Sequence, residues 1–439
     1  MASPSRRDLL RATGLGLAAI AGCAGREAPP NDTTMHTATE TRHTETTTQT
    51  TTDTMSETAT SAPRDCVPES IPENGWPLPD RGPTGANYAP AATGPTEKPT
   101  VRWKRTVEEP ETEGYLDVAL TSPVVTADRI FVGKALYPGT ENEMPDENAV
   151  HAYDRETGEL DWSHPTKATV PESVAVMGEA VYVVTAGSVR AVERRGGVER
   201  WRFDPERGVQ AATPTDGRIY VSTDSGSVVA LRTDGSVAWT ASVGDWVGTR
   251  PAVHDGTVFV GTGDSRLTAL RTDDGGERWS VQLVTSESNA REVPGDVAVT
   301  DCGVFATPHG GVVALDFDGR VRWRATGGQY VLSTDGETVY TGTESGRLIA
   351  LSAADGAVRW RTLLGEGSDQ KVEDVSSDPV VADGTLYCST RPGSLHSLDA
   401  DTRTENWNLE FDSSSEPEKP AAVDDELFVS VGPSLVALE

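Results

Sequence analysis

The residues best suited to bind a ligand are polar side chains that recur along the chain at intervals of roughly 40 residues. Each opens an apolar stretch that leads into a tight turn. They are Ser122, Ser173, Arg250, Asp296, Tyr330, Asp378 and Lys419, with Ala211 at the matching place in one further stretch. Hydroxyls and charges of both signs suit an ionic ligand or a peptide segment. The simpler expectation is that these charges pair with one another around a solvated opening, since such pairs are common and weak.

No pattern typical of a catalytic or metal centre accompanies these residues. A Ser, His and Asp arrangement, a His cluster at ligand spacing and a phosphate-binding glycine loop are all missing. Carboxylates gather in one insertion, residues 137–148, without the spacing of a calcium loop. They are Glu141, Glu143, Asp146 and Glu147. We therefore expect no catalytic residue, no metal ion and no cofactor.

Long connections between the repeats are the second candidate for binding. They cover residues 281–295 and 362–377, and Trp246 lies in a third. Irregular loops on a rigid scaffold commonly carry binding sites. Trp246 is predicted either to anchor a protein partner or to cap the neighbouring repeat.

Eight copies of one motif must position these residues. A tryptophan follows a glycine-containing turn in each copy, and a second aromatic residue stands between small or β-branched residues. The tryptophans are Trp103, Trp162, Trp201, Trp239, Trp279, Trp323, Trp360 and Trp407. The second aromatics are Phe131, Tyr182, Tyr220, Phe259, Phe305, Tyr340, Tyr387 and Phe428. Eight of each indicate eight units.

Each unit is predicted to be a four-stranded antiparallel sheet. Residues 250–279 contain four short apolar runs and three turns, the first at Asp255-Gly256, a strong hairpin signal. Val258-Phe259-Val260 is apolar on both faces, as in a sheet that is covered on both sides. Such units pack radially, which predicts an all-β, eight-bladed β-propeller over residues 100–439. Residues 100–104 supply the strand that residues 420–438 lack, and would close the ring.

The N-terminal region reads as an export signal and an anchor. Residues 1–22 have a basic start with Arg6-Arg7, which resembles a twin-arginine signal, and a short apolar run. Cys23 ends a segment similar to a lipobox, so it is the expected lipidation site. Residues 23–65 would form a threonine-rich stalk without a core, in which His36 and His43 are solvated. Residues 66–99 are expected to be an irregular leader packed on the propeller.

The charge is strongly negative, −30 in total, and only six basic residues are lysines. Such a surface repels nucleic acid and is typical of a protein that folds in concentrated salt, where screening removes self-repulsion. An ordinary acidic protein is the alternative. Cys302 and Cys388 lie two units apart, so a bond between them is not expected and both are predicted to be buried thiols. Cys66 has no obvious partner.

The repeat resembles the pyrroloquinoline-quinone-type propeller repeat, most closely at residues 155–162 and 347–351. The lipid-anchored, eight-bladed form is similar to the lipoprotein B subunit of the bacterial outer-membrane assembly machinery. The leader also resembles that of propeller lipoproteins from salt-loving archaea, which have no outer membrane. Quinone dehydrogenases with this repeat carry an adjacent cysteine pair, and this chain has none.

Together these features predict a monomeric, non-catalytic interaction or scaffolding module, lipid-anchored to the outer face of a cell membrane. Its partners would be other exported or membrane proteins. Two alternatives stay open: a quinone-dependent oxidoreductase with a degenerate site, and a surface lipoprotein that binds a small ligand or a sugar.

Overall fold

The computed structural model describes residues 75–439 with gaps, and the signal, the lipidation site and the stalk lie outside the described residues. The described ranges are 75–76, 78–79, 82–90, 92–108, 116–138, 147–167, 171–215, 217–244, 246–284, 295–308, 310–328, 331–343, 345–365, 374–391, 393–411 and 416–439. Within them all regular structure is β-strand. None of these residues belongs to a helix that could cross a bilayer.

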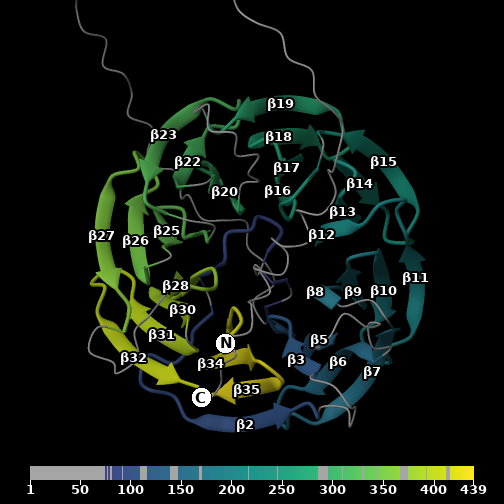
Figure 1. Ribbon diagram of the computed structural model, residues 1–439, viewed down its shortest axis with the longest axis vertical. Coiled ribbons are helices and arrows are strands. Elements are labelled where there is room, and N and C mark those ends of the chain that lie inside the picture. Colours follow the sequence, from purple (N-terminus) through teal and green to yellow (C-terminus); the bar gives the residue numbers. More distant parts are fainter. Residues whose placement is uncertain are drawn as a thin grey trace, which may run out of the picture. The chain divides into compact units, whose positions relative to one another are not determined.

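The described strands form eight sheets that stand around one axis, so the fold is an eight-bladed β-propeller. All of these strand pairs are antiparallel except that of β1 with β29 in blade 7, which is parallel. In Figure 1 the first strand of each blade lies nearest the centre and the last strand lies at the rim, as β16 and β19 show. Fold class and blade number agree with the sequence prediction.

The first four blades follow the chain in order. Blade 1 contains β3 (Leu116–Leu120), β4 (Val124–Val125), β5 (Arg129–Pro138), β6 (Asn148–Asp154) and β7 (Leu160–Lys167). Blade 2 contains β8 (Pro171–Met177), β9 (Ala180–Thr185), β10 (Ser188–Glu193) and β11 (Glu199–Phe203). Blade 3 contains β12 (Val209–Thr215), β13 (Arg218–Thr223), β14 (Ser227–Leu231) and β15 (Val237–Ser242). Blade 4 contains β16 (Ala252–His254), β17 (Thr257–Gly261), β18 (Arg266–Arg271) and β19 (Glu277–Gln282).

The other four blades include two strands from the N-terminal part of the chain. Blade 5 contains β20 (Val297–Thr300), β21 (Gly303–Ala306), β22 (Gly311–Leu315) and β23 (Val321–Thr326). Blade 6 contains β24 (Ser333–Thr334), β25 (Thr338–Gly342), β26 (Arg347–Ser352) and β27 (Val358–Leu363). Blade 7 contains β1 (Tyr88–Ala89), β28 (Asp374–Val375), β29 (Val380–Ala382), β30 (Thr385–Arg391), β31 (Ser394–Asp399) and β32 (Glu405–Glu410). Blade 8 contains β2 (Val101–Thr106), β33 (Ala421–Val423), β34 (Glu426–Val431) and β35 (Ser434–Leu438).

The ring is closed by β2, which pairs with β35 so that residues 101–106 share one sheet with the C-terminal strands. Trp103 of β2 lies over Phe428 of β34, with ring centroids 6.2 Å apart. The seven other blades repeat this pair at 5.8 to 6.0 Å, for example Tyr220 with Trp239 at 5.9 Å. Closure leaves blade 8 with the same internal packing as its neighbours and removes two open edges.

The tryptophans also join each blade to the next. The indole Nε1 of Trp239 donates to the carbonyl oxygen of Thr272 in blade 4 at 2.8 Å, and its ring lies against Gly275. Gly275 has a φ of 72°, a conformation that costs glycine little. The last link differs, because Trp407 donates to Pro95 of the leader at 2.9 Å. The leader thus replaces the turn that blade 8 lacks.

Candidate functional site

Residues 82–95, here called the strap, run past the inner strands of five blades. Backbone N–H groups near the ends of these strands, or in the turn that follows, donate to strap carbonyl oxygens. The pairs are Val253 to Pro83 at 2.7 Å, Val299 to Thr84 at 2.9 Å, Thr334 to Ala86 at 3.0 Å, Val381 to Asn87 at 3.0 Å and Asp425 to Thr93 at 3.0 Å. Figure 1 shows this part of the chain crossing the centre of the ring before it reaches β2.

The chain just before the strap is held in the same way. Trp76 and Val125 of blade 1 exchange two backbone hydrogen bonds of 2.7 and 2.9 Å. Leu78 packs in a cluster with residues of blades 2 and 3, including Tyr182 and Ile219. Both leader side chains are almost fully buried. The described leader therefore contacts the whole ring and is an integral part of it.

A buried polar hub joins the strap to two predicted site residues, Asp378 and Lys419. The Lys419 ammonium donates to Asp378 Oδ2 at 2.9 Å and to Asn87 Oδ1 at 3.0 Å. Asn87 Nδ2 in turn donates to the carbonyl of Leu332 at 3.0 Å, and the Leu332 N–H donates to Asp378 Oδ1 at 3.2 Å. Since Asp378 and Lys419 are each 8% exposed, they pair with each other and with the strap rather than face solvent.

The other predicted ring residues that the structure describes have contacts of their own. Ser122 donates to Glu418 Oε2 at 3.2 Å, and Ser173 and Ala211 are buried. Arg250 donates to the carbonyl of Ala212 at 2.8 Å.

Arg250 and Asp296 border the same small cavity beside Gly85 and Asn87, whose volume of about 10 Å³ holds at most one water. Tyr330 lies outside the described residues. Of the predicted ring residues that the structure describes, Asp378 and Lys419 pair with each other, while Ser122 and Arg250 bond to neighbouring groups.

Asn87 is the hub residue that the sequence analysis missed. Its backbone has a φ of 53°, and its side chain bonds both to blade 6 and to Lys419. A single asparagine in a segment without periodicity carries no signal of this role. Asparagine tolerates this left-handed conformation better than most residues.

Trp246 sits between blades 3 and 4 and packs against a turn of blade 4. The N–H of Gly263 donates to its carbonyl at 2.9 Å, and a Cβ at Gly263 would lie 3.0 Å from the indole ring. Val247, the next residue, is fully buried and bridges to Thr262. Trp246 itself remains 39% exposed. It therefore caps the turn of blade 4 and also presents a held aromatic surface.

Most of the acidic insertion lies outside the described residues, including Glu141, Glu143 and Asp146. Glu147 is described, and its backbone forms an isolated parallel β-bridge with that of Lys167. Among the described residues no three His, Cys, Asp or Glu side chains are grouped to hold a metal ion.

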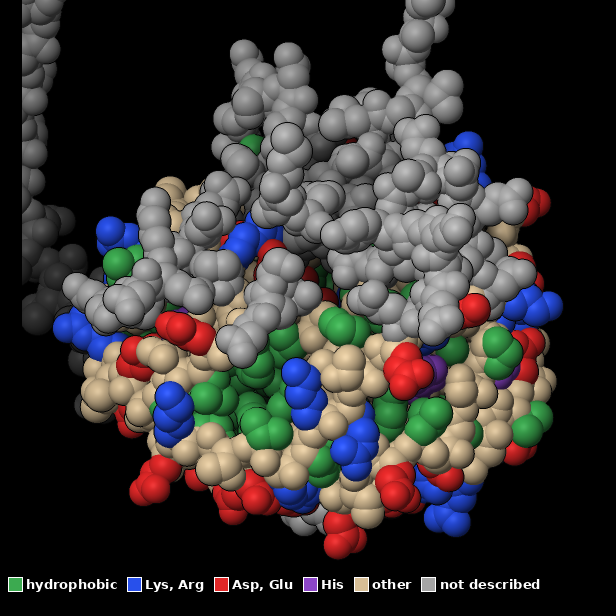
Figure 2. All heavy atoms as spheres, turned by 60° about the horizontal axis from the view of Figure 1, so that its bottom comes forward, with side chains coloured by type: hydrophobic (Ala, Val, Ile, Leu, Met, Phe, Trp, Pro, Cys, Tyr) green, Lys and Arg blue, Asp and Glu red, His purple; other side chains and the backbone are tan. Residues whose placement is uncertain are grey.

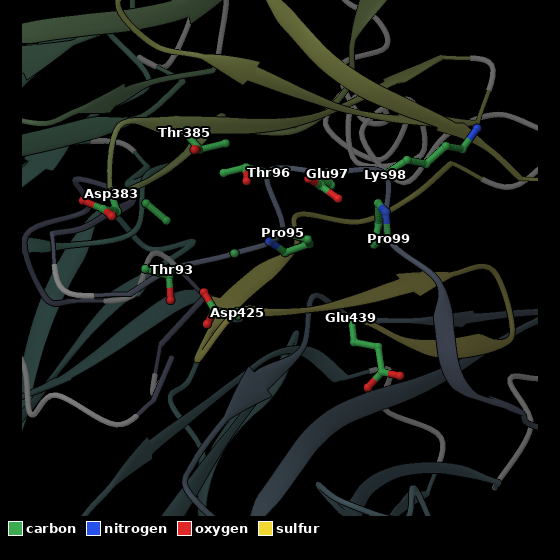
Figure 3. A pocket seen from close by; sticks show the side chains of 12 residues that line it. Thr93, Pro95, Thr96, Glu97, Lys98, Pro99, Asp383, Thr385, Asp425 and Glu439 are labelled. Atoms are coloured by element: carbon green, nitrogen blue, oxygen red, sulfur yellow. The ribbon is translucent and has the colours of Figure 1, made fainter.

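A hollow of about 560 Å³ lies at the seam of the ring, between residues 93–99 and the turns of blades 7 and 8. Figure 3 shows Glu97 and Asp425 on opposite sides of Pro95, and Asp383 and Thr385 also line the hollow. No aromatic side chain lines it. Because the hollow is open and polar, its carboxylates act on a ligand only through solvent-screened contacts.

Comparison with known proteins assigns the fold to one family. Residues 96–188, 185–329 and 326–438 match the family of the outer membrane protein assembly factor BamB. The chain belongs to this family. A BamB of Burkholderia pseudomallei is 25% identical over 249 residues, which cover 55% of this chain and 56% of that protein. A BamB of Moranella endobia is 24% identical over 244 residues, covering 52% and 54%. The chain thus spans about half the length of these curated relatives.

Solved structures agree on the fold alone. BamB from Moraxella catarrhalis superposes with a TM-score of 0.58 at 18% identity, over 78% of this chain and 97% of that one. The quinohemoprotein alcohol dehydrogenase from Comamonas testosteroni superposes with a TM-score of 0.65 at 12% identity, over 83% and 80%. A protein named as an assembly factor and an alcohol dehydrogenase share this architecture, so the fold does not decide the activity.

The cysteines of this BamB-family chain differ from prediction at one position. Cys388 is a free thiol whose complete burial raises its pKa, as expected for a core residue. Cys302 is disulfide-bonded, so the prediction of a buried thiol was wrong there. It lies half-buried in the turn between β20 and β21.

His151 makes the stability of blade 1 depend on pH. Burial, reinforced by the charge of Lys134, lowers its pKa from 6.5 to about 4, and its Nδ1 lies 2.9 Å from the Tyr153 hydroxyl. Because the unfolded chain takes up a proton first, this contribution is present above pH 6.5 and is lost as the pH falls toward 4. We expect the free energy of unfolding to fall by on the order of 3 kcal/mol over this pH range. His151→Gln should reduce the difference in the free energy of unfolding between pH 7 and pH 5, measured by denaturant titration. An unchanged difference would contradict this role of His151.

Proposed function

We propose that this protein is a non-catalytic interaction or scaffolding module that binds exported or membrane proteins through the side of the ring that carries Trp246. The name of its family describes an assembly factor. The inner strands of five blades are bonded to the protein's own strap. The observation that carries the proposal is Trp246, fixed by Gly263 and Val247 yet 39% exposed. A tryptophan held before binding loses little entropy on contact, as at interaction hot spots.

The proposal also covers residues 1–65, which precede the leader and would export and anchor the protein. Residues 1–22 serve as a twin-arginine signal, Cys23 carries lipid, and residues up to 65 form a spacer to the propeller. The protein then acts outside the cytoplasm on the outer face of the membrane. Curated relatives are named for the outer membrane, which agrees with an extracytoplasmic place.

Replacing Trp246 by Ala should abolish partner capture without unfolding the protein. A photo-crosslinking residue placed at Asp264, an exposed neighbour of Gly263, would mark partners in membranes from the source organism. We expect a recovery of the marked partner at least roughly thirtyfold lower, because a hot-spot truncation costs 2 kcal/mol or more. Val237→Ala, which truncates a side chain 46% exposed on the rim, is the matched control. Equal capture by both variants would remove Trp246 from the interface.

The quinone-dependent alternative is tested on the same protein. Addition of pyrroloquinoline quinone and calcium should give no saturable, dye-linked oxidation of alcohols or sugars. Turnover that follows the concentration of quinone would defeat the non-catalytic proposal. The hollow at Glu97 and Asp425 is the place to examine if a sugar alone binds.

The acidic surface predicts stability that depends on salt. The net charge is −30, and on the rim that Figure 2 turns toward the viewer, carboxylates and basic side chains are mixed. Raising the salt from about 0.01 M to about 1 M shortens the screening length from roughly 30 Å to 3 Å and weakens this self-repulsion. The unfolding midpoint should rise steadily with potassium chloride. A midpoint that stays constant over this range would favour an ordinary acidic protein over a halophilic one.

A further inference from the structure

The disulfide at Cys302 needs a partner sulfur that lies outside the described residues. The chain has four cysteines, and Cys388 is a free thiol. The sequence therefore leaves two choices for the partner, Cys23 and Cys66.

Cys302 lies beside the strap. It stands at the tip of the turn that joins β20 to β21, three residues after Val299, whose N–H donates to strap residue Thr84 at 2.9 Å. Its own carbonyl accepts a hydrogen bond from Arg322 at 2.6 Å, which fixes the turn. A leader cysteine that approaches this side of blade 5 meets Cys302 directly.

The length of the leader favours Cys66. Trp76 is bonded to blade 1 and Thr84 to blade 5, so eight residues of leader span the distance between these blades. Cys66 precedes Trp76 by ten residues, which is enough to span the same distance again. Cys23 precedes it by 53 residues, and the effective concentration of a tethered group falls as its tether lengthens.

We propose that Cys66 and Cys302 form a disulfide that fastens the leader to blade 5. The two thiols lose two protons and two electrons to an external disulfide, which is reduced to two thiols as the new S–S bond forms. The disulfide then adds a covalent link at blade 5 to the hydrogen bonds that already hold the leader to the ring. A bond of this kind persists in an oxidising compartment, so it also accords with export.

Peptide mapping of the unreduced, full-length protein tests the pair. After free thiols are blocked in denaturant, trypsin releases residues 65–81, which contain Cys66, and residues 292–320, which contain Cys302. We expect these two peptides as one linked mass that separates on reduction, and residues 372–403 with a blocked Cys388. A blocked Cys66, or a link from Cys302 to the peptide of Cys23, overturns the proposal.

Single variants provide an independent readout on the folded protein. Cys302→Ser should release one thiol that a maleimide labels at Cys66, and Cys66→Ser should release one at Cys302. The wild type and Cys388→Ser should label at neither position. Labelling of Cys66 in the wild type, or labelling of Cys23 that appears in the Cys302→Ser variant but not in the wild type, contradicts the pair. Should a variant fail to fold, the peptide map of the wild type still decides.

Discussion

Replacing Lys419 by Met should lower the free energy of unfolding by about 3–5 kcal/mol, among the largest effects of any single change in this protein. The change leaves the Asp378 carboxylate buried without its counter-charge, and leaves Asn87 Oδ1 without the ammonium that donates to it. Denaturant titration at neutral pH measures the loss. Lys104→Met is the control, because Lys104 lies exposed on the outer strand β2 and should change stability by less than about 0.5 kcal/mol.

A second variant separates the cost of a stranded charge from the value of the pair. Asp378→Leu together with Lys419→Met removes both charges, so the double variant should be more stable than Lys419→Met alone by about 1–3 kcal/mol. The Leu332 N–H still loses its acceptor, which keeps the double variant below the wild type. Equal losses in the single and the double variant would show that packing of the lysine stem, and not charge, governs this site.

The hub also shows which parts of the site the sequence could predict. Asp378 and Lys419 open the inner strands of adjacent blades, so the repeat alignment alone placed them close together. Asn87 comes from the leader, which has no repeat and hence no register, and only the folded path shows that it lies between them. Cys302 was misjudged for the same reason, because the missing sulfur lies in a segment without periodic pattern.

The propeller itself was predictable because each blade repeats the same packing of an aromatic residue against a tryptophan. Trp239, Tyr220 and their seven counterpart pairs mark a strand that is buried on both faces and an outer strand that covers it. Closure followed from counting strands, since the last unit lacked one and residues 100–104 supplied it. The contact proposed for Trp246 has no such internal copy, because this tryptophan lies outside the repeat series.

The contact between tryptophan and glycine yields the second large prediction, with a control matched in backbone geometry. Gly275 and Gly384 have nearly the same φ, 72° and 74°. A Cβ at Gly275 would lie 2.5 Å from the ring of Trp239, whereas a Cβ at Gly384 would meet nothing within 4 Å. Gly384→Ala therefore measures the conformational cost alone, about 1–2 kcal/mol.

Gly275→Ala adds the displacement of Trp239, and with it the hydrogen bond from the indole to Thr272. We expect a total loss of about 2–5 kcal/mol, since overpacking costs about 1–3 kcal/mol more. Thermal and denaturant unfolding of both variants measures the difference. If both variants lose the same amount, the glycines are required only for their backbone conformation. If Gly275→Ala loses more, the contact between successive blades limits the residue at this turn, which accounts for glycine beneath the tryptophan at six of the eight junctions.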